Sequence, residues 1–351
     1  MHINELLTIA RNERASDVHI TSGRNPLFRI DGVLHETQYP LSISEKRVMI
    51  LSLLTDKQCK KVESTIDVDT SYETEIGVRH RVNVFYQQQQ MAAAIRLLND
   101  TTPTFEELGL PEALRALADE PRGLILVTGP TGSGKSTTLA AMVDYINSKN
   151  AVHILTVEDP VEYVYKQKKA MIHQRNVGED VDSFSSALKS AMREDPDVIL
   201  VGEMRDYETI SAAITAAETG HLVLSTLHTT GAAMTVDRII DVFPPHSQQQ
   251  IRTQLAGVIK GVVTQTLLPR ASGVGRIAAF EIMLGTDAVS TLIRESKGHQ
   301  LNSIIQTSAR QGMILLDDYL VGLVRSGVVK KEAALEKAAN KTEFLSAIER
   351  I

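Results

Sequence analysis

The chain has 351 residues and carries 37 Lys and Arg against 43 Asp and Glu, so its formal net charge is −6. This acidic balance disfavours a wide nucleic-acid surface, which needs clustered Lys and Arg, but it leaves room for a narrow basic pore. One cysteine, Cys59, excludes an internal disulfide and a multi-cysteine zinc site and suits a reducing cytoplasm. No apolar run reaches the roughly 18 residues that span a bilayer, and no signal-peptide pattern opens the chain, so we expect a protein that is neither exported nor membrane-spanning.

The length predicts two domains, and the first hundred residues have the pattern of a small α+β domain. We expect helices over 3–13, 42–54 and 56–65, strands over 17–20 and 26–37, and two strands over 78–98. Asp31 and Gly32 are expected to form a hairpin turn, because both tolerate positive φ. Three prolines and little strand character mark the domain boundary within 99–123. The expected division is therefore 1–99, a linker at 100–120, and 121–351.

From residue 123 onward, short and continuously apolar β-branched runs alternate with segments of helical period. The runs expected to form strands are 123–129, 153–159, 197–203 and 221–230. Such alternation predicts a parallel sheet with helices on both faces. After "IAAFEIML", residues 277–284, the pattern changes to amphipathic helices without further strand signal.

The segment "GPTGSGKSTT", residues 129–138, matches the phosphate-loop pattern G-x-x-x-x-G-K-S/T. An apolar strand enters it and a helix leaves it, which is the context that makes the match specific. Backbone N–H groups and the helix N-terminus would cradle a phosphate. Lys135 would reach the β- and γ-phosphates of ATP, and the Ser136 hydroxyl would ligate Mg²⁺. The residues expected to bind the nucleotide are Gly129, Pro130, Thr131, Gly132, Ser133, Gly134, Lys135, Ser136 and Thr137.

The segment "DPDVILVGEMRD", residues 195–206, is similar to the strand that ends on a Mg²⁺-binding Asp in such sites, but Gly202 stands where that Asp belongs. Glu203 follows it. A second strand, "HILTVEDPVEY", supplies further acids, and the carboxyl ends of parallel strands meet at one edge of a sheet. We expect Glu203 and Glu158 to share the Mg²⁺ and water duties, with Glu203 activating water; these two roles could be exchanged. For Asp159 a loop cap and for Glu162 a surface ion pair are the open alternatives.

Two histidines flank the expected strand in "ETGHLVLSTLHTT", residues 218–230. His228 follows its carboxyl end, where a neutral imidazole can sense a phosphate through a hydrogen bond. His221 precedes the strand, and a capping or core role suits it equally well. A metal role is disfavoured for both, because their spacing is unlike that of ligand pairs.

Together these motifs resemble the Walker A, Asp box, Walker B and His box of the type II/IV secretion ATPase superfamily. The segment "ASDVHI", residues 15–20, is similar to the opening motif of that family, and the Gly-Glu ending of Walker B is itself a family mark. Within the superfamily the chain looks most like the PilT-type retraction ATPases of type IV pili. The lack of a tetra-cysteine loop and of a further N-terminal domain fits that group, and "LIRE", residues 292–295, loosely resembles its C-terminal motif.

The resemblance implies a fold of the α/β class, with a PAS-like α+β N-terminal domain, a RecA-like P-loop domain and extra C-terminal helices. It also implies a homohexamer in which the N-terminal domain of one subunit supplies arginines to the nucleotide of another. The matching residues here are Arg79, Arg81 and Arg96, of which we favour Arg81 and Arg96. A basic residue of many relatives is replaced within the glutamines at 87–90. Without the resemblance, an arginine near a strand end is usually a solvated charge or a member of a surface ion pair.

The resulting hypothesis is a cytoplasmic ATPase that uses ATP and Mg²⁺ to power pilus retraction at the cytoplasmic face of the inner membrane. The implied partners are an inner-membrane platform protein and, indirectly, pilin, with no direct contact with nucleic acid. A pilus-assembly or secretion ATPase is the alternative with the same engine. A nucleic-acid motor is disfavoured by the acidic balance, and a regulator without turnover by the complete acid set. We expect the helix that carries Arg294 and Glu295 to transmit domain motion or to contact the platform protein. The alternative is that these two residues form an exposed ion pair worth under about 1 kcal/mol.

Overall fold

The computed structural model describes residues 1–30, 32–65, 67–75, 77–98 and 101–349. Contacts divide the chain into two units, the first comprising Met1–Thr102 and Pro160–Val164 and the second Pro103–Asp159 and Tyr165–Ile351. Residue 99 and residue 100, where we placed the domain boundary, lie outside the described residues. Most of the remaining linker segment forms two short helices of the second unit.

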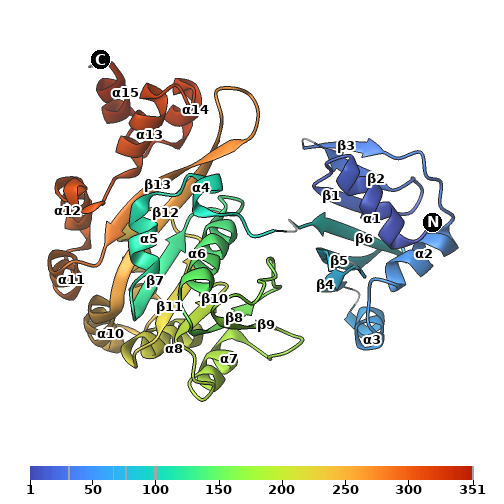
Figure 1. Ribbon diagram of the computed structural model, residues 1–351, viewed down its shortest axis with the longest axis horizontal. Coiled ribbons are helices and arrows are strands. Elements are labelled where there is room, and N and C mark those ends of the chain that lie inside the picture. Colours follow the sequence, from blue (N-terminus) through green and yellow to red (C-terminus); the bar gives the residue numbers. More distant parts are fainter. Residues whose placement is uncertain (31, 66, 76, 99–100, 350–351) are drawn as a thin grey trace. The chain divides into compact units, whose positions relative to one another are not determined.

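The first unit is an α+β fold around one antiparallel sheet (Figure 1). Its elements are α1 (Ile3–Asn12), β1 (Asp17–Ile20), β2 (Leu27–Ile30), β3 (Val33–Glu36), α2 (Ile43–Leu51), α3 (Asp56–Thr65), β4 (Asp67–Glu73), β5 (Arg79–Gln87) and β6 (Gln90–Leu97). The strands lie in the order β3-β2-β1-β6-β5-β4. The expected hairpin between β2 and β3 is present, with Ile30 opposite Val33 and Gly32 at φ 84°, while Asp31 lies outside the described residues.

Strand alternation sets the two faces of this sheet. In β5, Val82 and Val84 are fully buried in the core, whereas the alternating residues Arg81 and Asn83 are only half-buried. Leu6 and Leu7 of α1 pack into the same core cluster. Because successive side chains of a strand point to opposite faces, the arginines at odd positions of β5 lie on the face away from this core.

The second unit contains the remaining elements. They are α4 (Phe105–Leu108), α5 (Glu112–Ala118), β7 (Gly123–Thr128), α6 (Lys135–Lys149), β8 (His153–Glu158), β9 (Met171–Asn176), α7 (Phe184–Ala191), β10 (Val198–Val201), α8 (Tyr207–Glu218), β11 (Leu222–Leu227), α9 (Ala232–Asp241), α10 (Pro245–Val258), β12 (Ile259–Pro269), β13 (Arg276–Leu284), α11 (Asp287–Arg294), η1 (Gly298–Gln300), α12 (Leu301–Thr307), η2 (Ala309–Gln311), α13 (Leu316–Arg325), α14 (Lys331–Lys337) and α15 (Lys341–Glu349).

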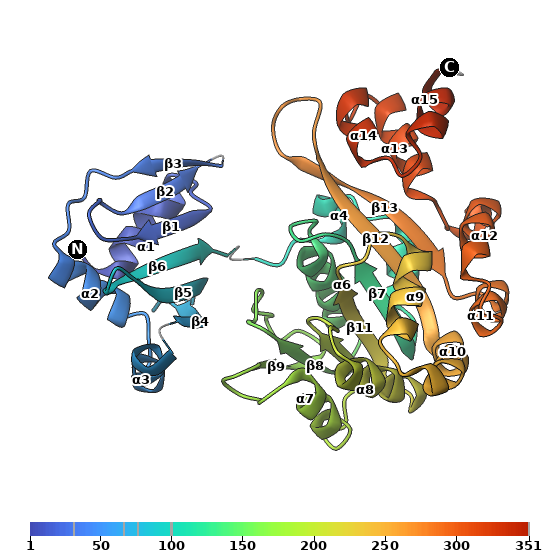
Figure 2. The same ribbon diagram turned by 180° about the vertical axis from the view of Figure 1, so that it is seen from behind.

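The sheet of the second unit has the strand order β13-β12-β7-β11-β10-β8-β9. Every neighbouring pair is parallel except β12 and β13, which form an antiparallel hairpin. Figures 1 and 2 show α6 on one face of this sheet and α8, α9 and α10 on the other. The four strands predicted from apolar runs are all present. The strands β9 and β12 were not predicted.

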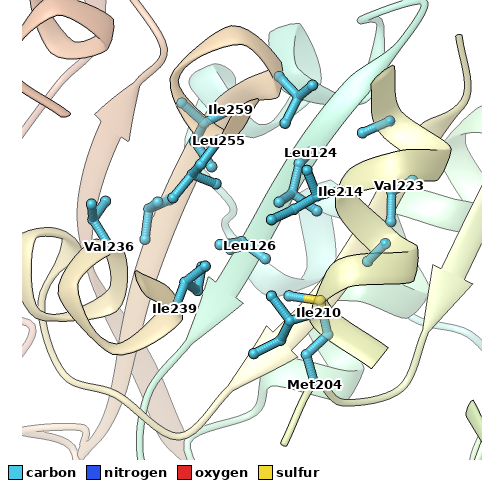
Figure 3. Close-up of a cluster of buried hydrophobic side chains, with 14 of the residues drawn as sticks. Leu124, Leu126, Met204, Ile210, Ile214, Val223, Val236, Ile239, Leu255 and Ile259 are labelled. Atoms are coloured by element: carbon cyan, nitrogen blue, oxygen red, sulfur yellow. The ribbon is translucent and has the colours of Figure 1, made fainter. Parts of the chain in front are cut away.

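The central strands are held by a continuous apolar core. Leu124 and Leu126 of β7 pack against Ile210 and Ile214 of α8 and against Leu255 of α10 (Figure 3). All residues of β7, β8, β10 and β11 are buried, as expected for strands that are covered on both faces. A separate cluster joins the C-terminal helices α13 to α15 to Leu268 and Ala279 of the β12–β13 hairpin. The central strands, which carry the motifs, are therefore a rigid platform.

Candidate nucleotide-binding and catalytic site

The phosphate loop connects β7 to α6 and contains three glycines with positive φ, a backbone conformation that other residues rarely adopt. Gly129, Gly132 and Gly134 have φ angles of 139°, 78° and 89°. A Cβ atom at Gly129 would lie 2.2 Å from the backbone oxygen of Gln265, so a side chain there is excluded sterically. The loop therefore presents backbone N–H groups at the start of the 15-residue helix α6, the arrangement that favours phosphate binding.

Lys135 is the first residue of α6 and is only 8% exposed. Its Nζ donates hydrogen bonds to the carbonyl oxygens of Gly129 at 2.9 Å and Pro130 at 3.1 Å. The Lys135 ammonium group is thus held against the backbone at the start of the phosphate loop. Ser136, next along the helix, is exposed, as a hydroxyl that ligates a bound metal ion needs to be.

Glu158 is the last residue of β8 and is 9% exposed. Its Oε1 accepts hydrogen bonds from Thr156 Oγ1 at 2.8 Å and, more weakly, from Gln174 Nε2 at 3.4 Å. The donor Gln174 lies on β9, the unpredicted edge strand. These two donors fix the orientation of the Glu158 carboxylate at this edge of the sheet.

Gly202 explains why the usual acid is absent from the end of β10. Its N–H donates to Val157 O at 2.8 Å, so the backbone runs directly beside β8. A Cβ atom at Gly202 would lie 3.3 Å from Val157 O and 3.4 Å from Glu158 Cα. The contact with Val157 O is slightly tighter than an ordinary van der Waals distance, and the contact with Glu158 Cα is at the short end of that range. A side chain at position 202 would therefore project toward the backbone at the end of β8.

Glu203 lies two residues beyond the last residue of β10, between the side chains of Arg205 and His228. Its Oε2 is 2.8 Å from Arg205 Nε and 3.5 Å from His228 Nε2. Arg205 is 70% exposed, so this ion pair is worth under about 1 kcal/mol and is readily exchanged for another partner. The other ring nitrogen of His228 lies 3.5 Å from Thr131 Oγ1 of the phosphate loop.

The strand order brings these side chains together. Strands β7, β11, β10 and β8 are consecutive neighbours, and at their carboxyl ends they carry the phosphate loop, His228, Glu203 and Glu158. All four predicted elements therefore lie along one edge of the second unit, where ligands bind in open α/β sheets. Among the described residues, no cluster of three or more His, Cys, Asp or Glu forms a metal site by protein ligands alone.

The remaining predicted residues lie elsewhere. Asp159 is exposed just after β8, and Glu162 belongs to the segment Pro160–Val164 of the first unit. The Nδ1 of His221 is 2.8 Å from Ala216 O near the C-terminal end of α8, which agrees with its interpretation as a capping residue. Glu295, for which an exposed ion pair with Arg294 was the open alternative, lies 2.7 Å from Lys297.

The three arginines are ion-paired within the first unit. Arg79 lies 3.3 Å from Glu73, Arg81 lies 2.6 Å from Asp69, and Arg96 lies 3.1 Å from Asp17. Arg81 and Arg96 stand directly opposite each other on β5 and β6. Like charges at such positions repel, and the neighbouring aspartates offset that repulsion.

Sequence reasoning missed the residues behind the phosphate loop. Gln265 of β12 is 2% exposed and binds both Thr138 and the carbonyl of Ser133, each at 2.7 Å. The preceding residue, Thr264, shares a buried hydrogen bond of 2.9 Å with Thr128 at the end of β7. The available signal was a run of polar residues inside the apolar segment "VVTQTLL", residues 262–268.

The fold and the site together define a P-loop ATPase of the secretion superfamily. The family model for type II/IV secretion system proteins matches residues 1–333, and the chain belongs to this family. It is 49% identical over 345 residues to the type IV pilus retractation ATPase PilT of Pseudomonas aeruginosa, an alignment that covers 98% of this chain and 100% of the relative. A twitching motility protein of Neisseria gonorrhoeae is 47% identical over 334 residues, 93% of this chain and 89% of the relative.

A crystal structure of the pilus retraction motor PilT with bound ADP matches the fold with a TM-score of 0.92 and 43% identity, and covers 100% of both chains. The expected fold class, a PAS-like domain followed by a RecA-like ATPase domain with additional C-terminal helices, is thereby confirmed. The chain is an ATPase. Within its described residues, the structure has no helix with the length and apolar character that a membrane crossing requires.

Proposed function

We propose that this ATPase powers the retraction of type IV pili and thereby twitching motility. The observation that carries the proposal is the full-length similarity to a pilus retraction motor, combined with a complete phosphate loop and acid set along one sheet edge. The similarity extends through both units, including the parts that lie outside the ATP-hydrolysing engine.

For the chemical step, we assign ATP to the loop at 129–137 and Mg²⁺ to Ser136, Glu158 and Glu203. These residues fit the metal, because they combine a hydroxyl at the start of α6 with two carboxylates from adjacent strands. When bound, Mg²⁺ would neutralise charge on the phosphates. Lys135 binds the phosphates, Glu203 orients and activates the attacking water, and Glu158 holds its position through Thr156.

We assign His228 as the residue that couples the presence of the γ-phosphate to the position of the Glu203 carboxylate. Its two ring nitrogens face Thr131 and Glu203, so a displacement of the loop changes its distance to the carboxylate. A neutral imidazole can donate one hydrogen bond and accept another, which suits a residue between a phosphate and an acid.

The assembly that we propose is a homohexamer in which Arg81 and Arg96 act on the nucleotide of a neighbouring subunit. Both lie on the sheet face away from the hydrophobic core of the first unit, and both are paired with exposed or partly exposed aspartates. Ion pairs of this kind contribute under about 1 kcal/mol, so each guanidinium can exchange its aspartate for a phosphate at little cost.

The proposed place of action is the cytoplasmic face of the inner membrane at the pilus base. There the ring would act on an inner-membrane platform protein and, through it, on pilin, without direct contact with nucleic acid. Arg294 is the candidate for transmitting this work, because it is exposed at the end of α11 and its guanidinium makes a long hydrogen bond of 3.4 Å to the neighbouring side chain of Thr291.

The test is deletion of the gene, scored for surface pili and twitching, followed by complementation. We expect the deletion strain to carry many pili that cannot shorten. The Arg294→Ala protein should hydrolyse ATP normally and fail to restore motility, while the control Lys297→Ala, at a nearby exposed cation, should restore it. A strain without pili would identify an assembly motor instead, and normal retraction with Arg294→Ala would return that residue to an ordinary surface charge.

A further inference from the structure

Gln265 occupies an unusual position for a buried amide, directly behind the phosphate loop. It lies on β12, which pairs in parallel with β7, the strand that leads into the loop. Its Oε1 accepts a hydrogen bond from Thr138 Oγ1 at 2.7 Å, and its Nε2 donates one to the Ser133 carbonyl at 2.7 Å. One side chain therefore joins the loop to Thr138 at the end of the first turn of α6.

The same residue also sets the space available to two glycines of the motif. A Cβ atom at Gly129 would lie 2.2 Å from the backbone oxygen of Gln265, and one at Gly134 would lie 2.8 Å from its Nε2. The loop therefore approaches Gln265 closely at both ends, at Gly129 through the Gln265 backbone and at Gly134 through the Gln265 side-chain amide. The loop curvature is defined from behind as well as by its own φ angles.

Ser133 is anchored through its carbonyl and not through its hydroxyl. Its Oγ is buried and has no hydrogen-bond partner among the described residues. Its N–H donates to Pro130 O at 3.2 Å within the loop, so the bond from Gln265 to its carbonyl is the one that ties Ser133, two positions before Lys135, to β12. Movement of Ser133 would be passed along the chain to Lys135 and Ser136.

We propose that Gln265 is a positioning residue for ATP hydrolysis, which holds the phosphate loop in its binding geometry before the nucleotide arrives. Phosphate binding needs several N–H groups to converge on one anion, and preorganisation of such groups raises affinity because less order is lost on binding. A loop released from β12 would sample other conformations, and both nucleotide affinity and the placement of Lys135 would suffer.

The alternative is that Gln265 contributes only to stability, as many buried amides do. The chain offers a matched comparison at the other end of the same helix. Asn147 of α6 is fully buried, donates from Nδ2 to Lys166 O at 2.8 Å and accepts from Lys168 N at 3.2 Å. Its side chain makes two hydrogen bonds, as that of Gln265 does. It lies 12 residues beyond Lys135 along α6, however, and neither of its bonds reaches the phosphate loop.

The experiment compares Gln265→Met, which nearly preserves shape, with Asn147→Leu in the full-length protein. The measurements are the dissociation constant of a fluorescent ADP, kcat and KM for ATP, and Tm. We expect Gln265→Met to weaken ADP binding at least about 10-fold, which corresponds to about 1.4 kcal/mol, and to raise KM. Asn147→Leu should lower Tm to a similar extent and leave ADP affinity within about twofold.

Thr138→Val keeps the proposal testable should Gln265→Met fail to fold, because it removes a single hydroxyl. We expect Thr138→Val to weaken ADP binding about threefold. The double variant that combines Thr138→Val with Gln265→Met should bind ADP no more weakly than Gln265→Met alone, because the two substitutions break the same hydrogen-bond network. Unchanged ADP affinity and KM in a folded Gln265→Met protein, or in Thr138→Val alone, would overturn the proposal. These binding measurements need no pili, so they do not depend on whether retraction is the cellular task.

Discussion

The Nε2 of His228 lies 3.5 Å from the Oε2 of Glu203, and this contact joins two strands that the sequence separates by a whole helix. The opposite ring nitrogen faces Thr131. The imidazole thus stands between the phosphate loop and the acid that we assign to water activation. The residue type alone would not have indicated a role at the site. His221, at the opposite end of the same strand, contacts Ala216 O near the C-terminal end of α8 instead.

The first prediction follows from this position. His228→Asn should keep ATP affinity within about threefold and lower kcat at least about 10-fold, since a loss of about 1.4 kcal/mol in the transition state has that effect. Single-turnover measurements with saturating ATP separate the two quantities. An equal rise in Kd and KM with unchanged kcat would show that His228 binds substrate without acting on the chemical step.

Glu203→Gln tests the acid itself. The amide retains the shape of the side chain but cannot accept a proton, so ATP binding should persist while turnover falls by about 10² to 10⁴. Glu218→Gln is the matched control, because that carboxylate accepts a hydrogen bond from Gln254 at the far end of α8. Near-normal hydrolysis by Glu203→Gln would assign water activation to Glu158.

Gly202 provides a steric test of the divided acid site. Both Gly202→Ala and Gly202→Asp should lower the free energy of unfolding by about 1 to 3 kcal/mol, because the added Cβ meets Val157 O and Glu158 Cα. Restoring the usual aspartate should therefore reduce turnover and not raise it. Denaturant unfolding and ATPase rates measured on both variants check this, and an active, stable Gly202→Asp protein would show that the two strands have room to spare.

The central fold could be predicted because four strands are short, apolar and buried on both faces. Strand β9 escaped prediction because it is an edge strand with exposed Met171 and His173, so it lacks a continuous apolar run. The two strands expected over 78–98 are present as β5 and β6, but the position of the turn between them was not predicted. Gln88 and Gln89 both have positive φ, at 47° and 63°, where Asn or Gly is the usual signal.

The site was predictable wherever its residues belong to a contiguous motif. The phosphate loop, Glu158, Glu203 and His228 each follow an apolar strand, and parallel pairing brings such positions together. Gln265 could not be found in this way. Its contact with Ser133 depends on β12 lying beside β7, and that neighbour relationship is a property of the strand order.

The action of arginines between subunits can be tested by mixing variants. Arg96→Ala should bind ATP and hydrolyse it slowly, because arginines supplied by a neighbour contribute about 10³ to 10⁵ in related phosphoryl-transfer systems. Mixed rings with Lys135→Ala subunits should recover part of the activity, since each variant supplies what the other lacks. Hexamers confirmed by mass measurement that stay inactive after mixing would contradict action between subunits. Arg81→Ala should behave in the same way as Arg96→Ala.

The last prediction concerns stability and pH. Glu281 on β13 is 8% exposed and accepts hydrogen bonds from the backbone N–H groups of Ala232, at 2.7 Å, and Leu316. Burial raises the pKa of its carboxyl above the ordinary value of 4.5, and the nearby Asp317 acts in the same direction, while the two N–H groups oppose them.

Because the folded protein holds this proton more tightly than the unfolded chain, stability is fully present below pH 4.5 and is lost as the pH rises through the raised pKa. Glu281→Gln keeps an acceptor oxygen and removes the titration. Its Tm relative to the parent protein should therefore increase as the pH rises above 4.5 and level off once the folded pKa is passed. Glu281→Leu, which leaves both N–H groups without an acceptor, should be less stable at every pH. A Tm difference between Glu281→Gln and the parent that stays constant from acid to neutral pH would mean that the carboxyl titrates alike in both states.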